Sequence, residues 1–332
     1  MRYKHLEKPN VDVSVLAAGT WLVGGDEYGD VTEKDCIKAI HTLLDNGVNL
    51  IDTAPCYGNG HSEEVVGRAI AGLDRSKFMI STKCGIKSTT SKCKRHPEIH
   101  EGKDCRDGSY TNVLFEVEQS LRRMKTDYID FLFIHWPDYD TPFSETMEAI
   151  NTLKREGKIR FAGLSNFCEK QIEECEKVAR IDVIQPPYSM VVRRDENLMK
   201  YAAAKGIGTF TYGSLGAGIL TGAFRSEPTF DPMDARSTFY PFFKEPDFGK
   251  VMKVLDVMDI ISSETGRPLS QIALNWSTQK DYVTAALCGS RNEKEALENV
   301  SAFQWELTDD QIARLDTAIK GNIDFDGTID CR

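Results

Sequence analysis

Four side chains that could do acid–base chemistry stand at the ends of predicted strands or in the loop after one. Asp52 ends a short apolar run and Tyr57 lies in the loop that follows it. Lys83 and His135 end two later runs. A carboxylate, a phenol, an ammonium group and an imidazole can transfer or stabilise protons when they surround one reacting atom. Singly, each also has a structural interpretation, in the same order as a helix cap, a loop aromatic, a solvated strand end and a buried histidine.

The elements that would position these residues are short apolar or β-branched runs, each followed by a stretch with helical periodicity. The predicted strands cover residues 14–18, 50–52, 78–83, 128–135, 159–165, 182–185, 208–212 and 283–288. Eight such units predict an α/β fold, a (β/α)8 TIM barrel, whose usual size is about 250 residues before insertions. A doubly wound sheet is the alternative, but no G-x-G-x-x-G follows the first strand. In a barrel the strand ends converge on one mouth.

Helix signals and loop lengths add detail to this barrel. Residues 32–46 predict a helix with an apolar stripe, which Gly47 would end as a C-cap residue. Two stretches exceed ordinary loop length, 84–109 after strand three and 221–247 after strand seven, and we expect both at the barrel mouth. No linker divides the chain, so residues 1–332 are predicted to form a single domain.

Charge and cysteine content restrict the partners and the compartment. The chain of 332 residues has 41 Lys+Arg and 51 Asp+Glu, a net charge of -10, which argues against binding nucleic acid or anionic lipid through overall charge. The uncharged run 207–224 is broken by glycines, so no membrane span is expected. Nine cysteines without a Cys-x-x-Cys pair predict reduced thiols in the cytoplasm. A small-molecule substrate is the expected partner, and both a monomer and a homo-oligomer fit.

A metal site is one interpretation of the first long loop. It contains soft or borderline ligands at Cys84, Cys93, His96, His100 and Cys105. Their spacing fits no zinc template, and the loop is also rich in Lys and Arg, so we predict no metal and a basic substrate loop.

Three ordered motifs resemble signatures of the aldo-keto reductase family, and the resemblance covers nearly the whole chain. The first is N-L-I-D-T-A-P-C-Y-G at 49–58 with S-E-E-V-V-G at 62–67. The second is S-L-R-R-M at 120–124, running into D-Y-I-D at 127–130 and I-H-W-P-D at 134–138. The third is G-K-I-R at 157–160 followed by G-L-S-N-F at 163–167.

The resemblance implies a catalytic tetrad made of the four residues introduced above. Tyr57 would give the proton to a carbonyl oxygen that accepts a hydride, and Lys83 would lower the pKa of the phenol from about 10. Asp52 would orient Lys83, and His135 would donate a hydrogen bond to the substrate oxygen. The substrate-binding residues expected are Trp21, Tyr57, His135 and Trp136.

The same resemblance implies a nicotinamide cofactor site. Ser165, Asn166 and Gln185 would hold the carboxamide, Tyr212 would stack on the ring, and the glycines after it would let the backbone approach the pyrophosphate. The full set of cofactor-binding residues expected is Gly19, Thr20, Trp21, Asp52, Ser165, Asn166, Gln185, Tyr212, Gly213, Ser214, Leu215, Gly218, Leu220, Gly289, Ser290, Arg291, Glu298 and Asn299.

Arg291 and its neighbours resemble the family's adenosine-phosphate motif. Ser290 and Arg291 at a predicted helix N-terminus favour an anion, so NADP(H) is the first choice of cofactor. Glu295 would repel a 2'-phosphate, which leaves NAD(H) as the alternative.

Two functions remain open from the sequence. The first is an NAD(P)-dependent oxidoreductase that interconverts a carbonyl and an alcohol on a sugar, polyol, or small aldehyde or ketone. The second is a nucleotide-sensing regulatory subunit with the same fold and little turnover, like the potassium-channel β-subunits.

Overall fold

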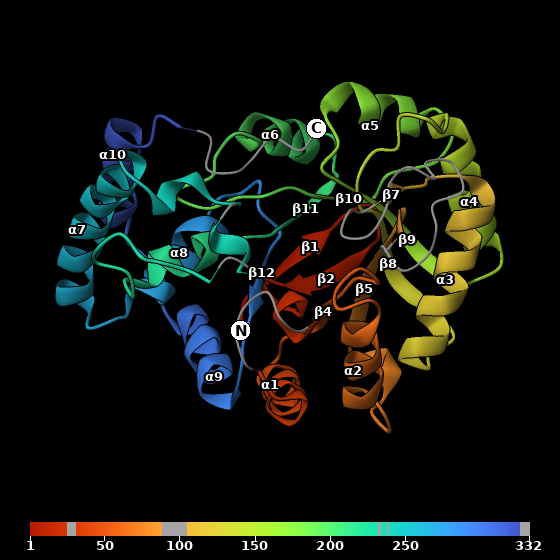
Figure 1. The fold of residues 1–332 in the computed structure, drawn as a ribbon, viewed down its shortest axis with the longest axis horizontal. Helices are drawn as coiled ribbons and strands as arrows, with labels where there is room; N and C mark the ends of the chain where they lie inside the picture. Colours follow the sequence, from red (N-terminus) through yellow and green to blue (C-terminus); the bar gives the residue numbers. More distant parts are fainter. Residues whose placement is uncertain (25–30, 88–104, 232–233, 238, 326–332) are drawn as a thin grey trace.

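Parallel strands form a closed barrel at the centre of the fold (Figure 1). The structure is a computed structural model and describes residues 1–24, 31–87, 105–231, 234–237 and 239–325. The strands follow the order β10-β11-β12-β3-β4-β5-β8-β9 around the barrel. Their bounds are β3 Leu16–Gly19, β4 Leu50–Asp52, β5 Met79–Cys84, β8 Ile129–Ile134, β9 Ile159–Ser165, β10 Val183–Gln185, β11 Gly208–Thr211 and β12 Ala285–Gly289. The predicted TIM barrel is confirmed.

Several predicted strand boundaries need correction by one or two residues. The first barrel strand is Leu16–Gly19, because Ser14 belongs to a separate hairpin. The last is Ala285–Gly289, so that Gly289 itself closes the strand. Tyr128 and His135 flank β8, and Tyr212 follows β11. The shift matters for the site, because His135 and Tyr212 stand just beyond the sheet, in the backbone that turns into the mouth.

Helices surround the barrel (Figure 1), and the apolar residues of most of them form one buried cluster with its strands. Their bounds are α1 Glu33–Asp45, α2 His61–Ala69, α3 Tyr110–Met124, α4 Phe143–Arg155, α5 Glu169–Glu176, α6 Glu196–Ala204, α7 Asp247–Thr265, α8 Leu269–Thr278, α9 Glu293–Ser301 and α10 Asp309–Asn322. Thr32 caps α1 by accepting a hydrogen bond from the Asp35 backbone. Asn46 is the C-cap, and Gly47 follows it with a φ of 86°, which corrects the prediction that Gly47 is itself the cap.

An N-terminal hairpin closes one end of the barrel. Strands β1 Tyr3–Leu6 and β2 Val11–Ser14 pair antiparallel and lie across the front of the barrel in Figure 1. Leu6 and Val13 join the buried cluster inside the barrel with Phe131, Phe133 and Phe210. A Cβ at Gly208, the first residue of β11, would lie 2.3 Å from Leu6 Cδ2, so only glycine admits the leucine there. The hairpin therefore fills the end where the strands begin.

Two insertions enlarge the opposite end, where the strands finish. The first begins and ends in a short hairpin, β6 Ile86–Lys87 with β7 Cys105–Arg106. The second, residues 221–247, contains the short 3-10 helices η4 Ala235–Ser237 and η5 Pro241–Phe243, and η3 Gly216–Thr221 leads into it. Further 3-10 turns are η1 Trp21–Gly24, η2 Arg75–Lys77 and η6 Ala302–Gln304. In the part of the chain that the structure describes, no helix has both the length and the apolar character needed to cross a bilayer.

Candidate functional site

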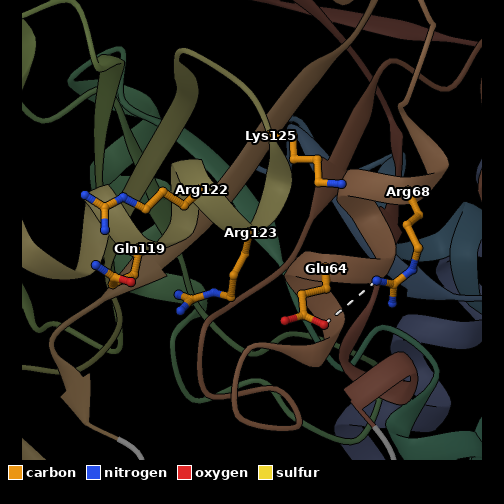
Figure 2. A pocket seen from close by; sticks show the side chains of 6 residues that line it. All are labelled: Glu64, Arg68, Gln119, Arg122, Arg123 and Lys125. Atoms are coloured by element: carbon orange, nitrogen blue, oxygen red, sulfur yellow. Dashed lines mark ion pairs between the residues drawn. The ribbon is translucent and has the colours of Figure 1, made fainter.

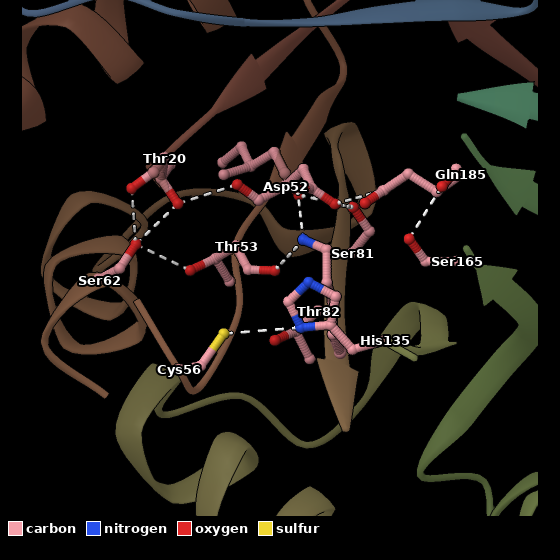
Figure 3. Close-up of polar contacts among 12 residues, drawn as sticks. Thr20, Asp52, Thr53, Cys56, Ser62, Ser81, Thr82, His135, Ser165 and Gln185 are labelled. Carbon is pink, nitrogen blue, oxygen red and sulfur yellow. Dashed lines mark hydrogen bonds and ion pairs between the residues drawn. The ribbon is translucent and has the colours of Figure 1, made fainter. Parts of the chain in front are cut away.

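A buried ion pair lies at the centre of the strand ends. Lys83 Nζ donates to Asp52 Oδ1 at 2.7 Å and to the Thr53 carbonyl at 2.8 Å. The other carboxylate oxygen of Asp52 accepts from Ser81 Oγ at 2.7 Å and from Gln185 Nε2 at 3.0 Å (Figure 3). Both charged side chains are nearly inaccessible to water, at 1% for Lys83 and 4% for Asp52. With its hydrogen-bonding groups engaged, the pair holds the ammonium group at one position.

Tyr57 lies against this ammonium group, in the loop between β4 and α2. Lys83 Nζ is 4.8 Å from the centroid of the Tyr57 ring. Trp21 stacks on the same ring with centroids 6.0 Å apart, and His135 meets it edge-on at 6.2 Å. The structure thus brings the four residues of the predicted tetrad together with Trp21.

His135 is a neutral imidazole in this setting. Burial lowers the pKa of its ring well below the usual value, and the positive charges of Lys83 and Arg106 lower it further. Its Nδ1 lies 3.5 Å from Cys56 Sγ (Figure 3). Trp136, the next residue, lies under the Arg106 guanidinium, whose central carbon is 4.9 Å from the ring centroid. A neutral imidazole carries one N–H and can donate one hydrogen bond from the ring.

A chain of hydrogen bonds joins the ends of β9, β10 and β11. Tyr212 OH donates to Asn166 Oδ1 at 2.8 Å, and Asn166 Nδ2 donates to Ser165 Oγ at 3.1 Å and to the His135 carbonyl at 3.0 Å. Ser165 Oγ donates to the Gln185 carbonyl at 2.8 Å. Burial raises the pKa of Tyr212, so its phenol stays protonated and donates. The predicted carboxamide and stacking residues are therefore one connected group beside Asp52.

The segment after Tyr212 exposes its backbone. Gly213 and Gly218 have φ values of 70° and 97°, in the region that favours glycine. A Cβ at Gly213 would meet no atom within 4 Å, and one at Gly218 would meet only Phe224 at 3.7 Å. Ser214 is buried with its hydroxyl on the Leu287 carbonyl, and Leu220 is part of the buried cluster with α7 and α8. Leu220 is therefore a packing residue, which leaves its backbone for any contact with a ligand.

The end of β12 leads into α9, where Arg291 is already paired. Its backbone N–H donates to Glu295 Oε2 and its Nε to Glu295 Oε1, both at 2.8 Å. Ser290 accepts from Asn299 Nδ2 at 3.0 Å, and Asn299 Nδ2 also reaches the Gly289 carbonyl at 3.3 Å. Glu298 accepts from Ser270 of α8 at 2.7 Å, which ties it to the helix layer.

Sequence reasoning missed the polar residues that support the pair and the tyrosine loop. Ser62 Oγ is within 2.8 Å of Thr20 Oγ1 and 2.9 Å of Thr53 Oγ1, which fastens the start of α2 to the ends of β3 and β4 (Figure 3). Ser81 is the second residue that was missed, and it supports the ion pair by donating a hydrogen bond to Asp52. Its position two residues before Lys83 on one face of a strand was the available signal.

Other candidate sites lie elsewhere or outside the described residues. A surface hollow of about 270 Å³ between α2 and α3 is lined by Glu64, Arg68, Gln119, Arg122, Arg123 and Lys125 (Figure 2). None of the predicted site residues lines it. Of the soft or borderline ligands in the first long loop, Cys93, His96 and His100 lie outside the described residues. Within the described residues, no group of three or more His, Cys, Asp or Glu side chains is arranged to hold a metal ion.

Comparison with known proteins places the chain in a family. The profile of the Aldo/keto reductase family matches residues 15–320. An aldo-keto reductase of Bacillus subtilis is 34% identical over 97% of this chain and 95% of its own length. An NADH-specific methylglyoxal reductase of Escherichia coli is 32% identical over 90% of this chain and 93% of its own. A probable voltage-gated potassium channel subunit beta of Arabidopsis thaliana is 31% identical over 91% of each chain.

Solved structures agree with the sequence comparison. The glycerol dehydrogenase of Gluconobacter oxydans superposes with a TM-score of 0.86 at 34% identity, covering 99% of this chain and 98% of that chain. The chain therefore belongs to the aldo/keto reductase family, and its general class is that of the oxidoreductases. The resemblance predicted from the three motifs is confirmed.

Proposed function

We propose that this protein is a nicotinamide-dependent reductase or dehydrogenase that interconverts a carbonyl and an alcohol, with Tyr57 as the general acid and base. The observation that carries the proposal is the position of the Lys83 ammonium group. Its Nζ is hydrogen-bonded to the buried Asp52 carboxylate and lies 4.8 Å from the centroid of the Tyr57 ring. A fixed positive charge at this place favours the phenolate form of the tyrosine and so favours proton transfer in both directions.

Each residue of the group has a distinct task in this mechanism. In reduction, Tyr57 gives its proton to the substrate oxygen while negative charge develops there, and Lys83 stabilises the phenolate that remains. His135, as a neutral imidazole, donates a hydrogen bond to the same oxygen and sets its angle. Trp21, which stacks on the Tyr57 ring, and Trp136 would offer apolar surface to the substrate. A nicotinamide cofactor, held by residues such as Gln185, Ser165 and Asn166, would supply or accept the hydride.

The residues present fit such a cofactor. Gly213 and Gly218 both have positive φ, and at Gly213 there is open space where a side chain would stand, which would let a pyrophosphate approach the N–H groups. Gln185, Ser165 and Asn166 offer amide and hydroxyl groups beside Asp52 that suit a carboxamide. Ser290 and the start of α9 would then lie toward the adenosine end.

The ion pair at α9 supports NAD(H) over NADP(H), which reverses the first choice made from the sequence. Glu295 accepts both from the Arg291 guanidinium and from its backbone N–H. A 2'-phosphate at this guanidinium would have to displace a carboxylate and tolerate its negative charge. A ribose hydroxyl brings no charge and avoids that cost.

Small polyols and short carbonyl compounds are the substrate class we propose. The similar proteins from Gluconobacter and Escherichia coli are named for glycerol and methylglyoxal. Both compounds are three-carbon molecules whose carbonyl or hydroxyl group could approach Tyr57 and His135. Free thiols at the described cysteines Cys36, Cys56, Cys84, Cys168, Cys175 and Cys288 support a reducing compartment such as the cytoplasm.

A second candidate function is cofactor sensing without appreciable turnover, which the similarity to a potassium channel subunit beta favours. An assay of purified protein with NADH and NADPH against glycerol, dihydroxyacetone, methylglyoxal and a sugar panel separates the two, with the nicotinamide absorbance as the readout. Multiple turnovers per minute with at least one pair support the enzyme. Tight cofactor binding with no more than one oxidation per protein molecule across the panel supports the sensor.

A further inference from the structure

A cysteine thiol makes the hydrogen bond to the ring of the histidine in the candidate site. Cys56 immediately precedes Tyr57 in the loop between β4 and α2, and it is half-buried. Its Sγ lies 3.5 Å from Nδ1 of His135, within reach of a sulfur hydrogen bond (Figure 3). The two side chains come from loops 79 positions apart in the sequence, so the barrel alone brings them into contact.

The backbone of His135 is held independently of this contact. Its N–H donates to the Cys84 carbonyl at 2.9 Å, and its carbonyl accepts from Asn166 Nδ2 at 3.0 Å. These bonds fix the main chain but leave the choice of ring tautomer open. Packing of the Tyr57 ring against the imidazole at a 6.2 Å centroid distance sets the plane of the ring and still does not choose the protonated nitrogen.

The proposed reaction decides the direction of the bond, because each of the two groups can donate or accept. The imidazole is neutral, because burial and two nearby cations oppose its protonation, so one nitrogen carries a proton and the other accepts. A thiol donates weakly and accepts weakly. If Nδ1 donated to sulfur, Nε2 would present a lone pair to the electron-rich substrate oxygen. If the thiol donates to Nδ1, Nε2 carries the N–H that this oxygen needs.

We propose that Cys56 is a positioning residue for the reaction, because its thiol donates to Nδ1 of His135 and thereby keeps the ring proton on Nε2, facing the substrate. Cys56 acts through the histidine and forms no bond with the substrate. The contact itself admits either direction, so both the tautomer assignment and its effect on turnover rest on the proposed function.

Nuclear magnetic resonance of the ring nitrogens tests the tautomer in the unmodified protein. Long-range proton–nitrogen correlation spectra of wild type, with His135→Gln to assign the signals, report which nitrogen is protonated. We expect the Nε2–H form to predominate at neutral pH. A predominant Nδ1–H form overturns the proposal whatever the enzyme's activity, and the expected form with no turnover overturns only the proposed function.

Two substitutions then test the cause. Cys56→Ala removes the donor, and we expect the Nδ1–H population to rise and kcat to fall about three- to tenfold, the range for one modest hydrogen bond. Cys56→Ser keeps a donor and should restore most of both. Cys168→Ser, which changes another half-buried thiol at the N-cap of α5, should leave both unchanged. Equal losses in Cys56→Ala and Cys56→Ser, or an unchanged tautomer ratio in Cys56→Ala, overturn the proposal.

Discussion

His135 links the site to the acid stability of the fold. Its folded-state pKa is well below the usual value, so the unfolded chain binds a proton at about pH 6.5 and the folded protein does not. The free energy of unfolding should be unaffected by this group above about pH 6.5 and should fall as the pH drops below it, by at most about 1.4 kcal/mol per pH unit. Urea unfolding between pH 7.5 and 5 measures the slope.

The substitution His135→Gln removes this titration, so the slope below pH 6.5 should become shallower than in wild type. His61→Gln, at an exposed position at the start of α2, is the matched control. Identical slopes for wild type and His135→Gln would mean that the pKa of His135 is the same in the folded and unfolded states, and would contradict the lowered folded-state pKa on which its assignment as a neutral donor depends.

Glu295 is expected to set the choice between the two nicotinamide dinucleotides. Glu295→Gln keeps an acceptor for the Arg291 backbone but removes the negative charge beside the guanidinium. The ratio of kcat/KM for NADPH to that for NADH should rise roughly tenfold, the size of about 1.4 kcal/mol. Glu293→Gln neutralises a carboxylate in the same helix turn whose partner is Lys38, and it should change the ratio much less. A ratio that responds equally to both variants would assign the effect to overall charge.

At the residue level, position is more predictable than contact. The sequence places Asp52, Lys83 and His135 at or just beyond strand ends, because apolar runs and the βα alternation are local signals. It does not reveal that the Cys56 thiol contacts the His135 ring or that the Glu295 carboxylate pairs with the Arg291 guanidinium. The first contact depends on two loops that only the closed barrel brings together, and the second, between residues four apart at the start of α9, depends on the rotamers of both side chains. The roles of the site residues remain predictions.

The β1–β2 hairpin contributes to the stability of the fold through the leucine that it buries in the barrel. Leu6 is 4% exposed and packs inside the barrel against the start of β11. Leu6→Ala should lower the free energy of unfolding by about 2–5 kcal/mol, since a buried leucine leaves a cavity. Leu297→Ala, at a leucine that is 44% exposed on α9, should change it by less than about 0.5 kcal/mol. Chemical denaturation followed by circular dichroism compares them.

The activity of folded Leu6→Ala protein tests whether the hairpin at one end of the barrel affects the candidate site at the other end. The hairpin fills the end where strands begin, and the candidate site lies where they finish, so kcat should stay within about twofold of wild type. A large loss of kcat with the fold intact would show that the hairpin supports the site.

Elements with long periodic patterns could be predicted, and short ones could not. The β9 and β4 bounds agree with the sequence expectation, because each strand is an apolar run between clear breaks. The β1–β2 and β6–β7 hairpins were missed, since two to four residues of mixed polarity give no period to detect. Helices α7 and α8 follow the long stretch 221–247 and lead to β12.

Over the whole chain, apolar and polar side chains are distributed as is typical of a (β/α)8 barrel. Aromatic and aliphatic side chains fill the interior, a hairpin covers one end, and the polar residues with reactive groups collect at the other. We propose that residues 1–332 form one domain, because strands from both halves of the sequence close the same barrel. A single coincident unfolding transition by circular dichroism and tryptophan fluorescence is expected. The net charge of -10 has little bearing on the site, whose charges are an internal pair.

The central claim is that Tyr57 exchanges the proton with the substrate, while Lys83, held by Asp52, favours the phenolate form of the tyrosine. Comparing wild type with Tyr57→Phe tests this most directly, because phenylalanine keeps the ring between Trp21 and His135 and removes only the hydroxyl. We predict a fall in kcat of about 10²–10⁴-fold, with the Kd of the reduced cofactor, measured by fluorescence, within twofold of wild type. A Tyr57→Phe protein that binds the cofactor equally well and turns over within a few-fold of wild type would contradict the account.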